Sequence, residues 1–290
     1  MGALFGVAGN SETFLRTVSK ASADAPAWLR SLGLDCYEYQ CGRGVRVGEE
    51  AARQIGQNAG AAGIALSIHA PYFISLSNPA PESLEKNIRY VTDSCRAAVW
   101  MGADRVVLHS GALMKRSRPE ALAIAKDSLR AILRACDEAG LGEITLCPET
   151  MGKLNQLGDL EEVLELCRLD ERLFPCVDFG HLYARSLGTD QGAEVCRAML
   201  DQMAHALGED RASRFHSHFS KIEFTPKGGE KRHLRFDDPG WGPEFAPLAR
   251  ELVRRNWSPR IICESAGTQS EDAVTMKQCY ETIKSEAEES

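Results

Sequence analysis

The chain has 290 residues, of which 43% are hydrophobic and 26% charged, so it can bury a large globular core. Its formal net charge of −7 argues against a general basic surface for nucleic acid, although bound metal cations would add positive charge that this count omits. No apolar run is long enough to span a membrane.

Eight short runs with the character of β-strands follow one another along the chain. In order they are "LFGVAG" from Leu4, "LDCYEY" from Leu34, "IALSIHA" from Ile64, "RVVLHS" from Arg105, "EITLCPE" from Glu143, "FPCVDF" from Phe174, "RFHSHFS" from Arg214 and "RIICES" from Arg260. Segments with helical periodicity lie between them. One of these opens at Pro119 and ends at Gly140, which are typical start and stop residues of a helix.

Eight alternations of strand and helix without a linker predict a single (β/α)8 barrel, an α/β fold, over residues 1–280. A doubly wound open sheet is the alternative, but no GxGxxG motif follows the first strand. The charged segment 281–290 is expected to form a frayed C-terminal tail.

Residue types that bind metals stand at the ends of the third to eighth runs. In chain order they are His69, His109, Glu149, Asp178 followed by His181, the pair His216 and His218, and Glu264. All strands of a parallel barrel open their carboxyl ends on one face, so these side chains are expected to converge there. Crowded carboxylates repel one another unless cations neutralise them, and no Lys or Arg recurs at these positions. The pattern therefore predicts a metal site, and nitrogen and oxygen ligands without cysteine favour zinc or manganese.

Short motifs around these residues resemble the endonuclease IV family of apurinic/apyrimidinic endonucleases. Besides His109 they are "HAPY" from His69, "PET" around Glu149, "DFGH" from Asp178, "HSHFSK" from His216, "RH" ending at His233 and "CES" around Glu264. They fall within residues 64–267, whereas the first two strands match poorly. The resemblance implies a barrel of the xylose-isomerase-like superfamily. It also implies two or three zinc ions and hydrolysis of a phosphodiester at abasic sites in double-stranded DNA.

The resemblance assigns metal ligands residue by residue. His69 and His109 would bind one metal, and Glu149 would bridge it to a second. His181 and His233 would bind a third.

The second metal would be completed by Asp178, Glu264 and one histidine of the seventh strand. His216 and His218 share a face of that strand, so alternation alone does not choose between them. The distance to the following "SK" dipeptide in the family's motif favours His216. Glu149 and Glu264 are the expected catalytic carboxylates.

Two aromatic residues are expected to contact DNA. Tyr72 and Phe73 resemble family residues that enter the minor groove, although packing on the barrel rim would explain them equally well. The family's earlier DNA-contacting loop is not recognisable in "QCGRGVRVGEE", where Arg43 and Arg46 are candidates.

The third metal site departs from the family pattern. Lys231 stands two residues before His233, where the family has an Asp, and a protonated Lys cannot bind a metal. Either the ammonium replaces the third cation, or the loop shifts and Glu230, Asp237 or Asp238 takes over. Gly228 and Gly229 would permit the shift.

Two other functions remain open. A sugar isomerase or epimerase would need one metal held by a Glu–Asp–His–Glu quartet, here Glu149, Asp178, His216 and Glu264, and would not need the His69–His109 pair. A metal-bound binding protein that has lost catalysis is the third possibility. The chain shows no signal-peptide pattern and its ten cysteines form no CxxC pair, so we expect a cytoplasmic monomer with reduced thiols.

Overall fold

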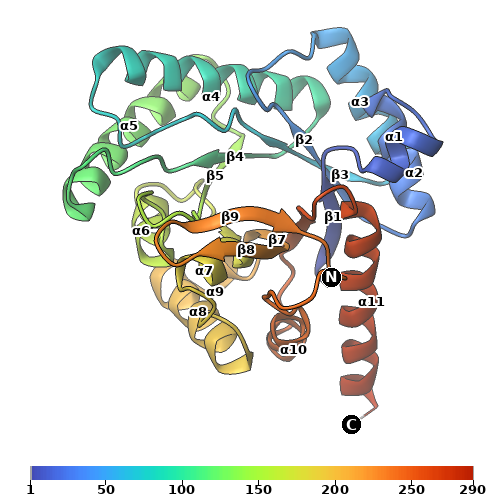
Figure 1. Cartoon of the computed structure of the whole chain (residues 1–290). Helices are drawn as coiled ribbons and strands as arrows, with labels where there is room; N and C mark the ends of the chain where they lie inside the picture. Colours follow the sequence, from blue (N-terminus) through green and yellow to red (C-terminus); the bar gives the residue numbers. More distant parts are fainter. Residues whose placement is uncertain (1, 290) are drawn as a thin grey trace.

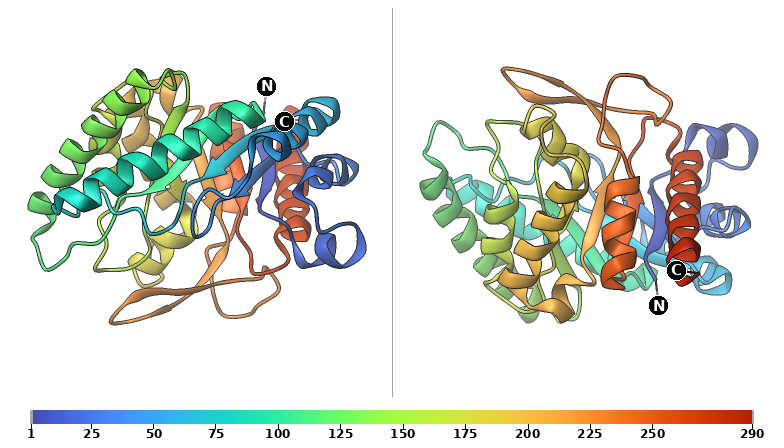
Figure 2. Two further views of the ribbon diagram at one scale, coloured as in Figure 1. Left: turned by 90° about the horizontal axis from the view of Figure 1, so that it is seen from above. Right: turned by 90° about the horizontal axis from the view of Figure 1, so that it is seen from below.

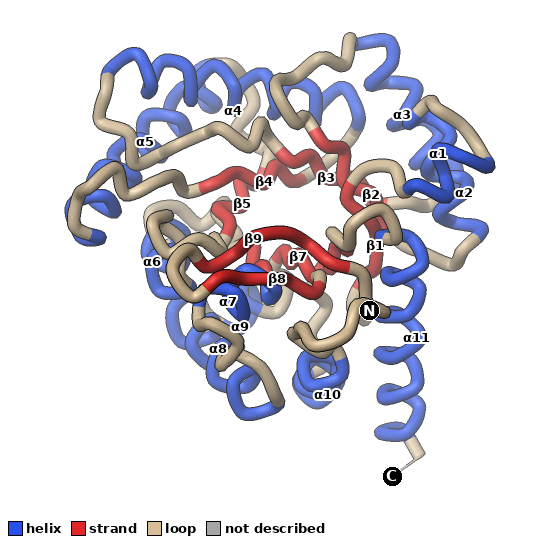
Figure 3. The backbone as a smooth tube through the Cα atoms, viewed as in Figure 1, coloured by secondary structure: helices blue, strands red, loops and turns tan. Residues whose placement is uncertain are grey.

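Parallel strands close into a barrel that helices surround. The structure, a computed structural model, describes residues 2–289. The barrel strands are β1 (Leu4–Ala8), β2 (Cys36–Gln40), β3 (Ala65–His69), β4 (Arg105–His109), β5 (Thr145–Glu149), β6 (Cys176–Asp178), β7 (His216–Phe219) and β10 (Arg260–Cys263). They close in the order β1-β10-β7-β6-β5-β4-β3-β2, and Figure 3 shows them as a ring inside the helices. The predicted (β/α)8 barrel is confirmed, and each of the eight runs supplies one strand.

The helices lie on the outside of the barrel (Figure 1). The longer ones are α3 (Glu49–Ala62), α4 (Pro81–Met101), α5 (Arg118–Glu138), α6 (Leu160–Cys167), α8 (Ala193–Leu207), α10 (Ala246–Arg255) and α11 (Gln269–Glu288). The shorter ones are α1 (Glu12–Thr17), α2 (Ala25–Ser31), α7 (Phe179–Arg185), α9 (Glu209–Ala212) and a 3-10 turn at Ser22–Asp24.

Local sequence sets the ends of the long helices. Ser117 and Glu120 form a capping box at the start of α5, and Pro119 stands in its first turn. Helix α4 opens at Pro81 and ends before Gly102, whose φ of 68° is a left-handed conformation that glycine adopts without strain.

The register of the strands brings the His, Glu and Asp residues at their carboxyl ends to one level. His109 lies opposite Glu149, and Asp178 lies opposite His218. Beneath them the barrel interior holds the small apolar cluster of Val107, Cys147 and Cys176 together with buried polar side chains such as Ser67 and His216. The polar side chains therefore project from the carboxyl ends of strands that the barrel holds in place.

An antiparallel hairpin interrupts the alternation between β7 and α10. Its strands are β8 (Lys221–Thr225) and β9 (Gly229–Leu234), and Figure 2 shows it projecting beyond the barrel. This hairpin was not predicted from the sequence. It brings residues 230 and 233 back to the barrel mouth.

The end of the described chain is helical. Residues 281–288 continue α11, so the expected fraying is not observed there. The segment contains neither Gly nor Pro, and pairs such as Lys284–Glu288 at 3.9 Å join successive turns. None of the helices in residues 2–289 is both long and apolar enough to cross a membrane.

Candidate metal centre

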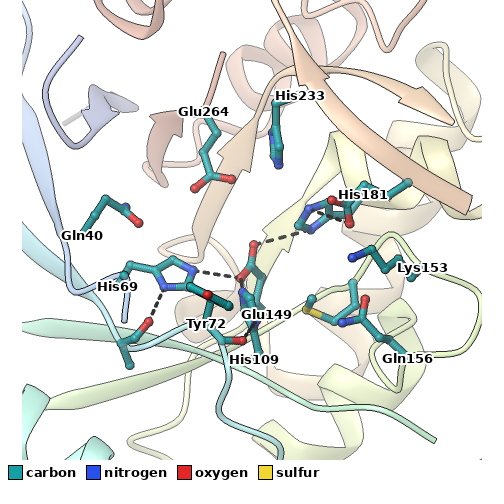
Figure 4. A pocket seen from close by; sticks show the side chains of 14 residues that line it. Gln40, His69, Tyr72, His109, Glu149, Lys153, Gln156, His181, His233 and Glu264 are labelled. Atoms are coloured by element: carbon teal, nitrogen blue, oxygen red, sulfur yellow. Dashed lines mark hydrogen bonds and ion pairs between the residues drawn. The ribbon is translucent and has the colours of Figure 1, made fainter. Parts of the chain in front are cut away.

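Glu149, the last residue of β5, lies at the centre of the barrel mouth (Figure 4). Its side chain is buried, and its Oε2 atom lies 3.3 Å from the Nε2 atoms of both His69 and His109. These histidines end β3 and β4 and lie edge to face, with ring centroids 5.1 Å apart. The Oε1 atom of Glu149 lies 2.9 Å from His218 Nδ1. Glu149 thus joins the predicted histidine pair to the ligands of the later strands.

Four histidines of the mouth have the Nδ1 atom of the ring held by a hydrogen bond to an oxygen atom. The Nδ1 atom binds a carbonyl or hydroxyl oxygen at 2.7 Å in His69 and at 2.8 Å in His109, His181 and His233. The other nitrogen of each ring is left for the pocket. Histidines that bind metals are typically oriented in this way, because the bound nitrogen fixes the tautomer.

A second group combines carboxylates from three strands with one imidazole. Ligand atoms of Glu149, Asp178, His218 and Glu264 all lie within 4.8 Å of one another. Asp178 Oδ1 accepts a hydrogen bond of 2.8 Å from the backbone N–H of His181 at the start of α7. Its Oδ2 is buried without a hydrogen bond, and its charged neighbour is His181 Nδ1 at 3.3 Å. Such an oxygen is costly unless a cation binds there.

In this geometry His218, and not the predicted His216, is the histidine of β7 that stands level with the other predicted ligands. Asp178 lies opposite His218, whereas His216 lies opposite Cys176, one inward-facing position deeper in the barrel. Both side chains point inward because side chains on a strand repeat every two residues, but only His218 reaches the level of Glu149.

Glu38 on β2 is a buried carboxylate that the sequence analysis missed. Its two oxygens lie 2.9 Å from His216 Nε2 and 3.0 Å from His218 Nε2. A Glu inside the strand-like run "LDCYEY" is a signal that could have indicated it, since a buried strand rarely carries an unpaired charge.

The third group forms with a replacement carboxylate. Ligand atoms of His181, Glu230 and His233 lie within 4.8 Å of one another, and His181 Nε2 is 3.5 Å from Glu230 Oε2. Lys231 points elsewhere, with its ammonium 2.5 Å from Glu223. The loop is therefore shifted relative to the family pattern, so that Glu230 and not Lys231 faces the two histidines.

A β-bulge produces this shift. In the hairpin Phe224 pairs with Glu230 and Glu223 pairs with Arg232, so Lys231 is an extra residue on β9. One extra residue reverses the faces of the strand, which places Glu230 on the side of His233. Gly229 takes a φ of 73°, and Glu230 N donates to the Gly152 carbonyl at 3.1 Å.

Members of all three groups line one pocket with a volume of about 280 Å³, whereas Asp178 and His218 are not among its lining residues. Tyr72 lies on its rim and is 50% exposed, whereas Phe73 is 41% exposed and packs edge to face on Tyr90 of α4. The early loop reaches the pocket through Gln40 and Gly42; Arg43 and Arg46 are not among the lining residues.

Lys153 brings a cation to the same pocket. Figure 4 shows its side chain entering from the loop after β5, beside His181. Within residues 2–289 its ammonium has no hydrogen bond or ion pair with a side chain. This free positive charge stands next to a mouth rich in carboxylates.

The titration behaviour of the mouth reflects its concentrated negative charge. Burial lowers the pKa of His69, but Glu149 outweighs it and raises that pKa to about 9. The pKa of His181 is likewise raised to about 9, because Asp178 and Glu230 outweigh burial. Burial raises the pKa of Asp178. The negative charge of the site thus favours bound cations. Without a metal, the imidazoles hold protons that partly neutralise the carboxylates.

The residues fit the metal that the sequence predicts. The fixed imidazoles, the Asp178 Oδ2 that accepts no hydrogen bond and the neighbouring carboxylates form a nitrogen and oxygen donor set. Zinc and manganese both accept such donors.

Comparisons with known proteins agree on the fold and differ in function. The sequence profile of the xylose isomerase-like TIM barrel family matches residues 26–282. An uncharacterized protein of Methanocaldococcus jannaschii is 31% identical over 255 residues, which cover 88% of this chain and 90% of that protein. A probable endonuclease 4 of Acholeplasma laidlawii is 28% identical over 200 residues, covering 67% of this chain and 65% of the endonuclease.

Two solved structures share the barrel. A D-tagatose 3-epimerase-like protein superposes with a TM-score of 0.71 at 16% identity, covering 98% of this chain and 99% of the other. Endonuclease IV from Thermus thermophilus superposes with a TM-score of 0.65 at 22% identity, with the same coverage. At these identities the likeness concerns the fold.

Proposed function

The chain belongs to the xylose isomerase-like TIM barrel family, and we propose that it is a metal-dependent hydrolase that resembles endonuclease IV. Its substrate would be double-stranded DNA with an abasic site, and the bond cleaved a phosphodiester at that site.

The observation that carries this proposal is the number of ligand groups. A single metal would be fully served by Glu149, Asp178, His218 and Glu264. The mouth also holds the His69–His109 pair and the group of His181, Glu230 and His233. These extra groups are superfluous for one metal and are what a multi-metal phosphodiesterase needs.

The roles of the residues follow from their positions. Glu149 would connect two metals, since its two oxygens face different groups. Bound zinc or manganese would polarise the phosphate and offset the charge that develops on its oxygens. Lys153 would bind a non-bridging phosphate oxygen, and the exposed ring of Tyr72 on the pocket rim would contact the DNA groove.

The test is a metal analysis of the purified protein together with cleavage of a duplex oligonucleotide containing one abasic site. We expect at least two metal ions per chain and strand cleavage that chelation abolishes. An intact duplex of the same sequence is the control. One metal per chain without cleavage would contradict the proposal, and bound metal without any turnover would favour a binding protein.

A second function is favoured by the Glu149–Asp178–His218–Glu264 group taken alone. An epimerase would use that quartet to hold one metal, with Glu149 and Glu264 transferring protons on carbon. The epimerase-like fold neighbour is compatible with this reading. Conversion of a ketohexose by protein lacking His69 and His109 would support the epimerase, because it makes no use of that pair.

A further inference from the structure

Glu38 lies inside the barrel, level with Ser67 and one inward-facing position below His69, where neither proposed reaction uses it. It is completely buried, yet its carboxylate accepts four hydrogen bonds. The donors are His216 at 2.9 Å, His218 at 3.0 Å, Ser67 at 3.0 Å and Gln40 at 3.1 Å. Two donors reach each oxygen, so the carboxylate is held in one orientation.

His218 connects this carboxylate to the ligand groups above. Its Nε2 faces Glu38, whereas its Nδ1 lies 2.9 Å from Glu149 Oε1 and 3.5 Å from Glu264 Oε2. A neutral imidazole carries one N–H and one lone pair. An ionised carboxylate can only accept, so Nε2 must carry the hydrogen when Nδ1 offers its lone pair to a cation.

His216 supports the same carboxylate from below. Its Nε2 donates to the other oxygen of Glu38, and its Nδ1 is buried without a hydrogen-bond partner. Within residues 2–289 its side chain therefore hydrogen-bonds to Glu38, and it stands one inward-facing position deeper than His218.

We propose that Glu38 is a positioning residue that fixes the tautomer and ring orientation of His218, with His216 holding Glu38 in place. It thereby sets the metal affinity of the group formed by Glu149, Asp178, His218 and Glu264. This inference rests on the proposed metal-dependent function, but it concerns residues that lie outside the assigned ligand set.

Glu38→Gln tests the link at nearly constant volume. The amide can no longer accept from both imidazoles, so one ring must change tautomer, and the negative charge that strengthens His218 as a ligand is lost. We expect the affinity for added Zn²⁺ or Co²⁺ to fall roughly 10- to 100-fold at this group. The cobalt absorption spectrum should change, and histidine ¹⁵N NMR should show a mixed tautomer at His218. Ser67→Ala, which leaves three donors, is the matched control and should bind metal within a few-fold of wild type.

A double-mutant cycle with His218→Asn separates positioning from a general effect of charge. If Glu38 acts through His218, Glu38→Gln should not weaken metal binding further once the imidazole is gone. If Glu38→Gln weakens metal binding equally in the wild type and in His218→Asn, the inference is overturned. It is also overturned if the wild type binds metal and Glu38→Gln binds it with the same affinity. Failure of the wild type to bind metal would overturn the proposed function as well.

Folding of the metal-free variants is checked by thermal melting. Should Glu38→Gln not fold, Glu38→Asp keeps the charge and withdraws the carboxylate from both rings. If Glu38→Asp then binds metal with wild-type affinity, the inference is overturned. If it binds metal more weakly while the metal-free variant melts like the wild type, the inference is supported.

Discussion

Glu149 is surrounded by imidazole rings from four different elements of the structure. His69, His109 and His218 lie within 3.3 Å of its oxygens, and His181 Nδ1 is 3.5 Å away. Burial alone would raise the pKa of this carboxyl, but His218 and the hydrogen bonds from the imidazoles hold it well below its usual range. Glu149 therefore remains ionised. It belongs both to the group with His69 and His109 and to the group with Asp178, His218 and Glu264.

We predict that Glu149→Ala removes most of the bound metal and nearly all activity while the barrel stays folded. The ligands that remain are fixed by their own strands, so the fold does not depend on this side chain. Metal content and thermal melting are measured on the same sample, with Glu165→Ala, which alters an ion pair on the outer surface, as control. Wild-type metal stoichiometry in Glu149→Ala would rule out a shared ligand.

Lys153 should bind the substrate and leave the metal in place. We predict that Lys153→Ala raises KM for an abasic oligonucleotide about fivefold, the effect expected for an exposed ion pair, with unchanged metal content. The increase should shrink at high salt because ions screen exposed charges. Lys153→Arg should restore much of the binding. An unchanged KM at low salt would show that this ammonium does not contact the phosphate.

The β8–β9 hairpin is the element that completes the third group. Gly152 and Gly229 let the hairpin approach the loop after β5. A Cβ atom on Gly229 would lie 2.3 Å from the Gly152 carbonyl oxygen, and one on Gly152 would lie 2.7 Å from Glu230 Cβ. The position of Glu230 beside His181 therefore depends on two residues without side chains.

We predict that Gly229→Ala disrupts the third group alone. Its φ of 73° is strained for alanine, and the added Cβ must push the hairpin away from Gly152. The expected result is the loss of about one metal ion per chain, with the first two groups intact. Gly228→Ala is the control, because its Cβ meets a side-chain hydroxyl, that of Thr225, at 3.0 Å. Equal metal content in both variants would contradict this role of the hairpin.

At the scale of the whole molecule, metal binding should stabilise the barrel. The candidate ligands at the mouth come from the ends of β3 to β7 and β10, so a bound cation would tie together strands that are far apart in the sequence. A ligand that binds only the folded state adds about 2.7 kcal/mol at one hundred times its Kd.

We predict that chelation lowers the Tm by roughly 5–10 °C, since about 1 kcal/mol corresponds to 2–4 °C in a protein of this size. Added zinc or manganese should restore the Tm of the wild type but not that of Glu149→Ala. Differential scanning calorimetry at fixed free metal concentration checks both. A Tm that is indifferent to metal in the wild type would argue against a resident metal.

The sequence by itself determined the barrel and most of the candidate ligand residues. Strand and helix alternate eight times without a linker, and parallel strands place their carboxyl ends on one face, so His69, His109, Glu149, Asp178 and Glu264 had to meet. That reasoning needs only the chain order of the elements and the direction of the strands.

Tertiary structure decided which neighbouring residue reaches the mouth. His216 and His218 share a face, and only the register of β6 against β7 places His218 level with Asp178. A bulge in the hairpin selects Glu230 over Lys231. The physical reason is the same in each case: strand periodicity fixes the face of a side chain, whereas its height depends on pairing with strands far away in the sequence. Glu38 escaped prediction for this reason too, because its partners come from other strands.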